Sequence, residues 1–256
     1  MRGLQWFNAL SAGATPVDGL ANSLKVADGL LGEQAVRFIA VVTDAQNRFP
    51  RARNGEVGLL EGWGLAKAVD EAIAQGDRRP IIAIVDVPSQ AYGRREEALG
   101  IHQALAAAAD SYARARLAGH PVIALLVGKA MSGAFLAHGY QANRLIALRD
   151  PGVMVHAMGK ASAARVTLRS VEELEALAAS VPPMAYDIDS YASLGLLWET
   201  LSVSQIEQPT AEDVARVSDC LVSAIKDIGS TDLSGRLGAT NRAASSHVRQ
   251  LLREQW

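Results

Sequence analysis

Residues 121–139 read PVIALLVGKAMSGAFLAHG, a short apolar run that leads through small residues into a second apolar segment. The run Val122–Val127 shows no alternation of polar and apolar residues, which is typical of a strand buried on both faces. Small residues at Ser132-Gly133-Ala134 then begin a predicted helix. The runs Phe38–Val42 and Ile81–Val85 have the same apolar character. Together the three runs predict neighbouring strands of a parallel sheet.

Helical segments separate these predicted strands. Residues 61–75 (EGWGLAKAVDEAIAQ) place apolar side chains on one helical face. Arg95–Leu117 is rich in Ala, Leu, Arg and Glu, which predicts one long helix that ends at Gly119, with Pro121 as a stop. Strands that alternate with helices predict an α/β fold with right-handed crossovers.

The second half of the chain repeats this rhythm more weakly. Thr210 is the predicted N-cap of a helix that runs to about Ile228, and Ser230–Gly238 is a polar break. No linker is long enough to separate two domains. We therefore expect one domain over residues 1–256, with an N-terminal segment of about 1–30 and a helical C-terminal extension of about 205–256. The other predicted elements are strands at Arg144–Leu148, Val153–His156 and Leu196–Val203, and helices at Val171–Ala179 and Arg242–Glu254.

The composition excludes several classes of protein. The chain has 256 residues, a formal net charge of -2 and a single cysteine, Cys220. Near-neutral charge argues against nucleic acid or an anionic membrane as the main partner, and one cysteine excludes a disulfide framework. The histidines lack the spacing of a metal site, so we expect none. No apolar run approaches the roughly 20 residues that span a bilayer, and we expect a cytoplasmic protein without a targeting segment.

The helix start at Ser132-Gly133-Ala134 is the first candidate site. Free backbone N–H groups at a helix start attract negative charge, so the amides of Gly133 and Ala134 are candidates for an oxyanion site. Close packing of the helix on the strand is an equally good explanation. The segment is neither a phosphate loop nor a dinucleotide-binding motif. It is not a nucleophile elbow either, because Ala130 stands where that motif needs glycine.

A second candidate site is the loop that follows the Ile81–Val85 strand. Residues 86–93 read DVPSQAYG, and open α/β sheets bind ligands at the carboxyl ends of their strands. An ordinary turn would explain this loop alone, but two polar loops after neighbouring strands are more telling. Asp86, Glu96 and Glu97 are possible acid–base residues, although a solvated helix start also explains the two glutamates.

Five segments together resemble the gamma subunits of biotin-independent malonate decarboxylases, within the carboxyltransferase branch of the crotonase (ClpP-like) superfamily. The family motifs Asp-x-Pro-Gly and Gly-Gly-Ala correspond here to residues 86–89 (DVPS) and 132–134 (SGA), with serine in place of one glycine in each. Met158-Gly159 and Ala163-Ala164 match a third motif. The segments are FIAVV (38–42), NRFPRARNGEVGLLEGWGLAKAV (47–69), PIIAIVDVPSQAYGRREEALG (80–100), PVIALLVGKAMSGAFLAHG (121–139) and VMVHAMGKASAARV (153–166).

The resemblance implies a crotonase fold of repeated ββα units with a helical C-terminal extension. It also implies decarboxylation of a malonyl-thioester to an acetyl-thioester, in a site shared with a beta-type decarboxylase subunit. The substrate is then carried on the CoA-like prosthetic group of an acyl-carrier protein subunit, loaded by an acyl-carrier transferase subunit, and this chain itself binds no cofactor. The implied catalytic residues are Gly133, Ala134 and Ser132, and the implied substrate contacts are Ser89, Gln90, Tyr92, Met131 and His156.

Three alternatives remain open at this point. In the first alternative, the chain is a carboxyltransferase subunit of a biotin-dependent acyl-CoA carboxylase, although it contains no biotin-carrier sequence. In the second, it is a non-catalytic scaffold, with all chemistry in the partner. Or it is a serine hydrolase with Ser132 or Ser89 as nucleophile, against which the lack of a recognisable triad order counts. Tyr92, a water molecule or a partner residue supplies the proton to the product.

Overall fold

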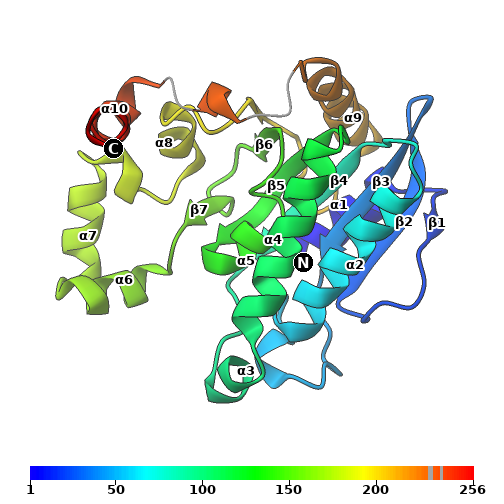
Figure 1. Ribbon diagram of the computed structural model, residues 1–256, viewed down its shortest axis with the longest axis horizontal. Coiled ribbons are helices and arrows are strands. Elements are labelled where there is room, and N and C mark those ends of the chain that lie inside the picture. The colour runs from blue at the N-terminus through cyan, green and yellow to red at the C-terminus, as the bar shows by residue number, and fades with distance from the viewer. Residues whose placement is uncertain (230–232, 237–238) are drawn as a thin grey trace.

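The computed structural model describes residues 1–229, 233–236 and 239–256. Its centre is an eight-stranded sheet in the order β1-β2-β3-β4-β5-β6-β8, with β7 paired to the outer part of β5 (Figure 1). Of the polar break predicted at Ser230–Gly238, residues 230–232 and 237–238 lie outside the described part.

The three apolar runs form the middle of the sheet, as the sequence predicts. They correspond to β3 (Gln34–Val41), β4 (Ile81–Val87) and β5 (Val122–Met131), which are parallel to one another. Every residue of the runs 81–85 and 122–127 is fully buried. Burial on both faces removes the need for polar alternation and explains the uniform apolar character of these runs.

Strand β5 extends beyond Gly128, where the sequence suggested that it would end. A side chain at Gly128 would collide with the carboxylate of Asp86, which fills the space above it. That carboxylate accepts the backbone N–H of Lys129 at 3.1 Å and that of Gly3 at 3.0 Å. The strand therefore continues to Met131. Asp86 is a structural link between helix α1 (Arg2–Leu10) and the sheet.

Strand β5 pairs in turn with two short strands. Its first half pairs with β6 (Arg144–Leu148), and its last three residues pair with β7 (Met154–His156). Strand β8 (Glu199–Leu201), shorter than predicted, pairs with β6. The diverging partners open the sheet at the carboxyl end of β5, where helix α5 (Ser132–Ala137) begins.

The N-terminal residues belong to the sheet rather than to a separate segment. Helix α1 buries Trp6 completely. Strand β2 (Leu24–Leu31) pairs antiparallel with β3 over its full length, and β1 (Thr15–Pro16) pairs with β2. These elements were not predicted from the sequence.

Helices cover both faces of the sheet. Figure 1 shows α2 (Leu59–Ala74) and α4 (Ile101–Leu117) side by side on one face, with α1 and α9 (Ala211–Lys226) behind the sheet. The prediction of one helix over residues 95–117 was wrong. The structure has α3 (Arg94–Ala98) and then α4, because Gly100 adopts φ +82°, a backbone conformation that favours glycine and interrupts the helix.

The remaining helices lie together beyond β7, away from the body of the sheet (Figure 1). Thr210 caps α9 through the N–H of Asp213, as predicted. None of the helices in the described residues is long and apolar enough to cross a membrane. The helices beyond β7 are α6 (Lys160–Thr167), α7 (Val171–Ala178), α8 (Ile188–Ser193) and α10 (Ala243–Gln255). Short 3-10 turns occur at Pro50–Ala52, Pro182–Met184, Ser234–Arg236 and Thr240–Arg242.

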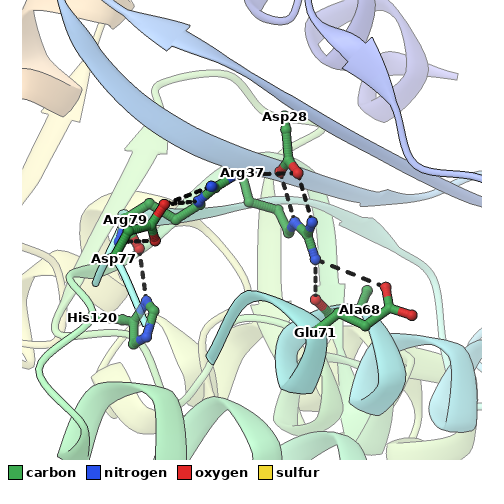
Figure 2. Close-up of polar contacts among 7 residues, drawn as sticks. All are labelled: Asp28, Arg37, Ala68, Glu71, Asp77, Arg79 and His120. Atoms are coloured by element: carbon green, nitrogen blue, oxygen red, sulfur yellow. Dashed lines mark hydrogen bonds and ion pairs between the residues drawn. The ribbon is translucent and has the colours of Figure 1, made fainter. Parts of the chain in front are cut away.

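A polar network closes the amino ends of the central strands (Figure 2). The guanidinium of Arg37, on β3, is buried and makes two hydrogen bonds to the carboxylate of Asp28, at 2.7 and 2.6 Å. It also donates to the carbonyl of Ala68 on α2 at 2.6 Å. Arg79 approaches the same Asp28 carboxylate at 3.2 Å. The network joins β2, β3 and α2 at this end of the sheet.

Candidate functional site

The two candidate loops meet at the carboxyl ends of β4 and β5. The backbone N–H of Gln90, in the loop after β4, donates to Oγ of Ser132 at 3.3 Å. The backbone N–H of Gly133 donates back to the side-chain Oε1 of Gln90 at 3.0 Å. Two hydrogen bonds in opposite directions thus join the two loops, between residues 42 and 43 positions apart in the chain.

Ser132 occupies a strained position between β5 and α5. Its φ of +54° lies in the left-handed region, which a non-glycine residue adopts only when its surroundings hold it there. The strain aims the hydroxyl at the loop after β4. Within the described residues no histidine or carboxylate is hydrogen-bonded to Oγ of Ser132. His138 is fully buried and bonds Tyr112 and the Ile84 carbonyl instead. The geometry of a Ser-His-Asp hydrolase is not present here.

The amides of Gly133 and Ala134 are both enclosed. Gln90 occupies the Gly133 N–H, and Ala134 has no exposed surface at all. The start of α5 still presents the positive end of its first turn to this corner of the molecule. Any ligand that uses the Gly133 amide directly has to displace the carboxamide of Gln90.

The backbone around Gln90 is fixed from the other side by Val57. The Val57 N–H donates to the Ser89 carbonyl at 3.1 Å, and the Ala91 N–H donates to the Val57 carbonyl at 2.8 Å. Oγ of Ser89 donates to the Gln90 carbonyl at 2.8 Å. These bonds pair Val57 with Gln90 in a single isolated parallel bridge, which fixes the backbone from which the Gln90 side chain extends.

Beside α5 lies a cavity of about 620 Å³ with a mainly apolar wall. Ser132, Gly133 and His156 reach it. The ring of His156 stacks on Tyr186, with the ring centroids 3.9 Å apart. Burial lowers the pKa of His156, which keeps its ring neutral near pH 7. The buried Tyr191 hydroxyl on the cavity wall has no hydrogen-bond partner in the described part of the chain.

The other residues proposed from the sequence lie around these two features. Ser89 is half-buried, whereas Tyr92 is 56% exposed at the tip of its loop. Met131 is buried at the end of β5, where it pairs with His156 of β7. Of the two glutamates considered for acid–base work, Glu97 is exposed and Glu96 is buried, so a solvated helix start accounts only for Glu97. Among the described residues no group of three or more metal-binding side chains comes together.

The capping of Gly133 by Gln90 and the role of Val57 were not predicted. Val57 belongs to an irregular segment before α2, and nothing in its local sequence shows that it pairs with Gln90. Both contacts arise from chain crossings that bring distant loops together. Only the placement of each loop after a neighbouring buried strand indicated that they would meet.

The sheet topology, with two loops that meet at the carboxyl ends of its parallel strands, is that of the crotonase fold. Transcarboxylase 12S has this fold, with a TM-score of 0.63 at 22% identity over 83% of this chain and 37% of that one. The malonate decarboxylase gamma subunit family model matches residues 52–256. The chain belongs to this family and has the function of a subunit of a malonate-decarboxylating enzyme.

Solved structures from Pseudomonas are similar over the whole chain. A malonate decarboxylase hetero-tetramer in complex with coenzyme A contains a chain 72% identical to this one, with a TM-score of 0.94 and coverage of 100% and 99% of the two chains. An MdcD-MdcE hetero-dimer gives 68% identity, a TM-score of 0.91 and the same coverage. A curated relative from Malonomonas rubra, malonyl-S-ACP:biotin-protein carboxyltransferase MADD, is 34% identical over 230 residues, 86% of this chain and 75% of that protein.

Proposed function

We propose that this chain and a beta-type subunit form a decarboxylase site that converts a malonyl-thioester on an acyl-carrier protein into the acetyl-thioester and CO₂. The whole-chain similarity to Pseudomonas malonate decarboxylase carries the proposal. A thioester substrate is supported by the coenzyme A in one of those structures and by the malonyl-S-ACP substrate named for the Malonomonas relative. The complex that we propose for this chain also includes an acyl-carrier protein subunit and an acyl-carrier transferase subunit. One cysteine in 256 residues favours a cytoplasmic setting.

The chemistry requires stabilisation of an enolate. The bond between the α-carbon and the carboxylate breaks, CO₂ leaves, and the electron pair is delocalised onto the thioester oxygen. A proton then returns to the α-carbon from Tyr92, water or the partner. Donors fixed near that oxygen are worth roughly 3–4 kcal/mol each. The junction of Gln90, Ser132 and Gly133 is the place in this chain where such donors are held, beside the first turn of α5.

A second candidate function is that of a non-catalytic scaffold that shapes and stabilises the partner's site. One observation favours it: the Gly133 amide is occupied and Ala134 is buried. In that case the single domain proposed for residues 1–256 contributes only surface and rigidity.

Release of CO₂ from malonyl-CoA by this chain, by its beta-type partner and by the purified pair tests the proposal. We expect a stable pair and activity only in the pair. A pair without activity, or a stable monomer of this chain that decarboxylates malonyl-CoA unaided, would contradict it. Avidin is added in a parallel reaction, because inhibition by avidin would transfer the function to the biotin-dependent type of the Malonomonas relative.

A further inference from the structure

The orientation of the Gln90 carboxamide is determined by its partner. The backbone N–H of Gly133 can only donate, so the atom 3.0 Å from it is the side-chain oxygen of Gln90. The amide nitrogen, Nε2, then points away from Gly133. The Gln90 backbone is bonded to Ser132 and flanked by Val57, and the side-chain oxygen is bonded to Gly133. The Gln90 side chain is therefore held at its base and at its tip.

Two N–H donors of this carboxamide remain available. In the described part of the chain, Nε2 of Gln90 makes no hydrogen bond to another residue, and Gln90 is only half-buried. A fixed amide group with both N–H bonds unused lies where two loops converge at the carboxyl ends of β4 and β5. This edge of an open α/β sheet is where ligands bind.

We infer that Nε2 of Gln90 is the donor that this chain offers to the thioester oxygen as negative charge develops on it. The inference rests on the proposed function and gives that function a specific group. It explains why the Gly133 amide is occupied. The Gly133 N–H polarises the carboxamide by bonding its oxygen, and the amide nitrogen of the same carboxamide then serves as the donor to the substrate. Hydrogen bonds in such chains strengthen one another by about 10–30%.

The carboxamide also differs from a backbone amide in its reach. Gly133 lies partly beneath the side chains of Gln90 and Leu105, which are 3.4 and 3.6 Å from the position of an added Cβ. A thioester that approaches from the loop after β4 meets the Gln90 side chain first, because Oε1 of Gln90 covers the Gly133 N–H on that side. Hence the substrate oxygen is bound without any rearrangement of α5. The competing explanation is that Gln90 is a plug, a side chain that only blocks the Gly133 N–H and that the substrate has to displace.

The variant Gln90→Glu distinguishes a hydrogen-bond donor to the substrate from a residue that only accepts the Gly133 N–H. Glutamate keeps an oxygen for the Gly133 N–H and strengthens that bond by its charge, but it places a second oxygen where the donor was. In the assembled pair we expect kcat for malonyl-CoA to fall on the order of 100-fold with a small change in KM. Activity should partly recover at acid pH, where a protonated carboxyl again offers a donor. Gln103→Glu, the same change at an exposed position of α4, is the matched control and should retain activity.

Gln90→Ala provides a second, uncharged variant. If Gln90 is the donor, its removal lowers kcat by a similar factor; if it is a plug, the freed Gly133 amide raises turnover or leaves it unchanged. Wild-type turnover in either assembled variant would overturn the inference while the proposed function stands. A wild-type pair that does not decarboxylate malonyl-CoA would overturn the proposed function and the inference with it.

Discussion

The hydroxyl of Tyr112 donates a hydrogen bond to Nδ1 of His138 at 3.0 Å in the core behind the candidate site. The tautomer follows from the second bond of the ring, because Nε2 lies 3.0 Å from the Ile84 carbonyl and has to be the protonated nitrogen. Both side chains are fully buried. The pair joins α4 and β4 to the end of α5, and so fixes the helix whose first turn carries Ser132 and Gly133.

This buried pair predicts a loss of stability at mildly acid pH. Burial lowers the pKa of His138 from 6.5 to about 4, so the folded chain resists a proton that the unfolded chain accepts. The stability contributed by the neutral ring is therefore complete above pH 6.5 and is lost as pH falls from there towards 4, at up to about 1.4 kcal/mol per pH unit. Urea unfolding at several pH values measures this slope. In His138→Gln, which has no ring to titrate, the slope between pH 6.5 and 5 should be shallower. Equal slopes in the two proteins would contradict the assignment.

The buried guanidinium of Arg37 predicts a second stability effect. Arg37→Met leaves the Asp28 carboxylate with Arg79 alone and removes the side-chain donor to the Ala68 carbonyl. We expect a loss of about 3 kcal/mol in the free energy of unfolding, at the low end for a broken buried ion pair because Arg79 remains. Arg114→Met is the matched control, since Arg114 pairs with Asp110 and Asp70 at an exposed position. That change should cost less than about 1 kcal/mol. Similar losses in the two variants would show that burial of the Arg37 pair is unimportant.

The middle of the sheet was predictable because its residues are buried on both faces and carry an unmistakable apolar pattern. The strand β2 and helix α1 were missed for the opposite reason. The sequence of β2, LKVADGLL, mixes charged and apolar residues, and buried and partly exposed positions follow one another along the strand without regular alternation. Helix α3 was merged with α4 because the interrupting residue, Gly100, stands among strong helix formers. Local composition does not reveal a positive φ.

For the candidate site, the sequence predicted the two loops but not their bonding. Topology alone places Gln90 near Gly133, because both follow neighbouring parallel strands. The donor and acceptor pairing depends on the strained backbone of Ser132 and on the Val57 bridge. These are tertiary features, and no local pattern encodes them. The expectation of free amides at Gly133 and Ala134 therefore came from the helix start considered alone.

The positive φ of Ser132 predicts that glycine is more stabilising than alanine at this position, which reverses the usual order in a helix. At an ordinary helical position alanine is more stable than glycine by about 1 kcal/mol. At φ +54° a Cβ is unfavourable, so Ser132→Gly should be more stable than Ser132→Ala. Thermal unfolding of the two variants measures the difference. Turnover by the assembled Ser132→Gly pair should stay within about tenfold of wild type, and a loss on the order of 1,000-fold would restore the nucleophile hypothesis.

The last prediction concerns Gly133, whose missing side chain leaves room for the carboxamide of Gln90. A single added Cβ would lie 3.4 Å from Oε1 of Gln90 and 3.6 Å from Cδ1 of Leu105, which is ordinary contact. Gly133→Ala should therefore assemble and retain most activity. The branched side chain of Gly133→Val has to displace one of these neighbours, and the carboxamide of Gln90 is the nearer of the two. Turnover of malonyl-CoA by the assembled pair should then fall on the order of 100-fold, the value of one lost oxyanion donor.

Light scattering of the purified pair separates this loss from a failure to assemble. His102→Ala, on the exposed side of α4, is a control that should cost little. Near wild-type turnover in a correctly assembled Gly133→Val pair would mean that neither the Gly133 amide nor the carboxamide it holds contacts the reacting oxygen. In that case the donors belong to the partner, and this chain acts as the scaffold around them.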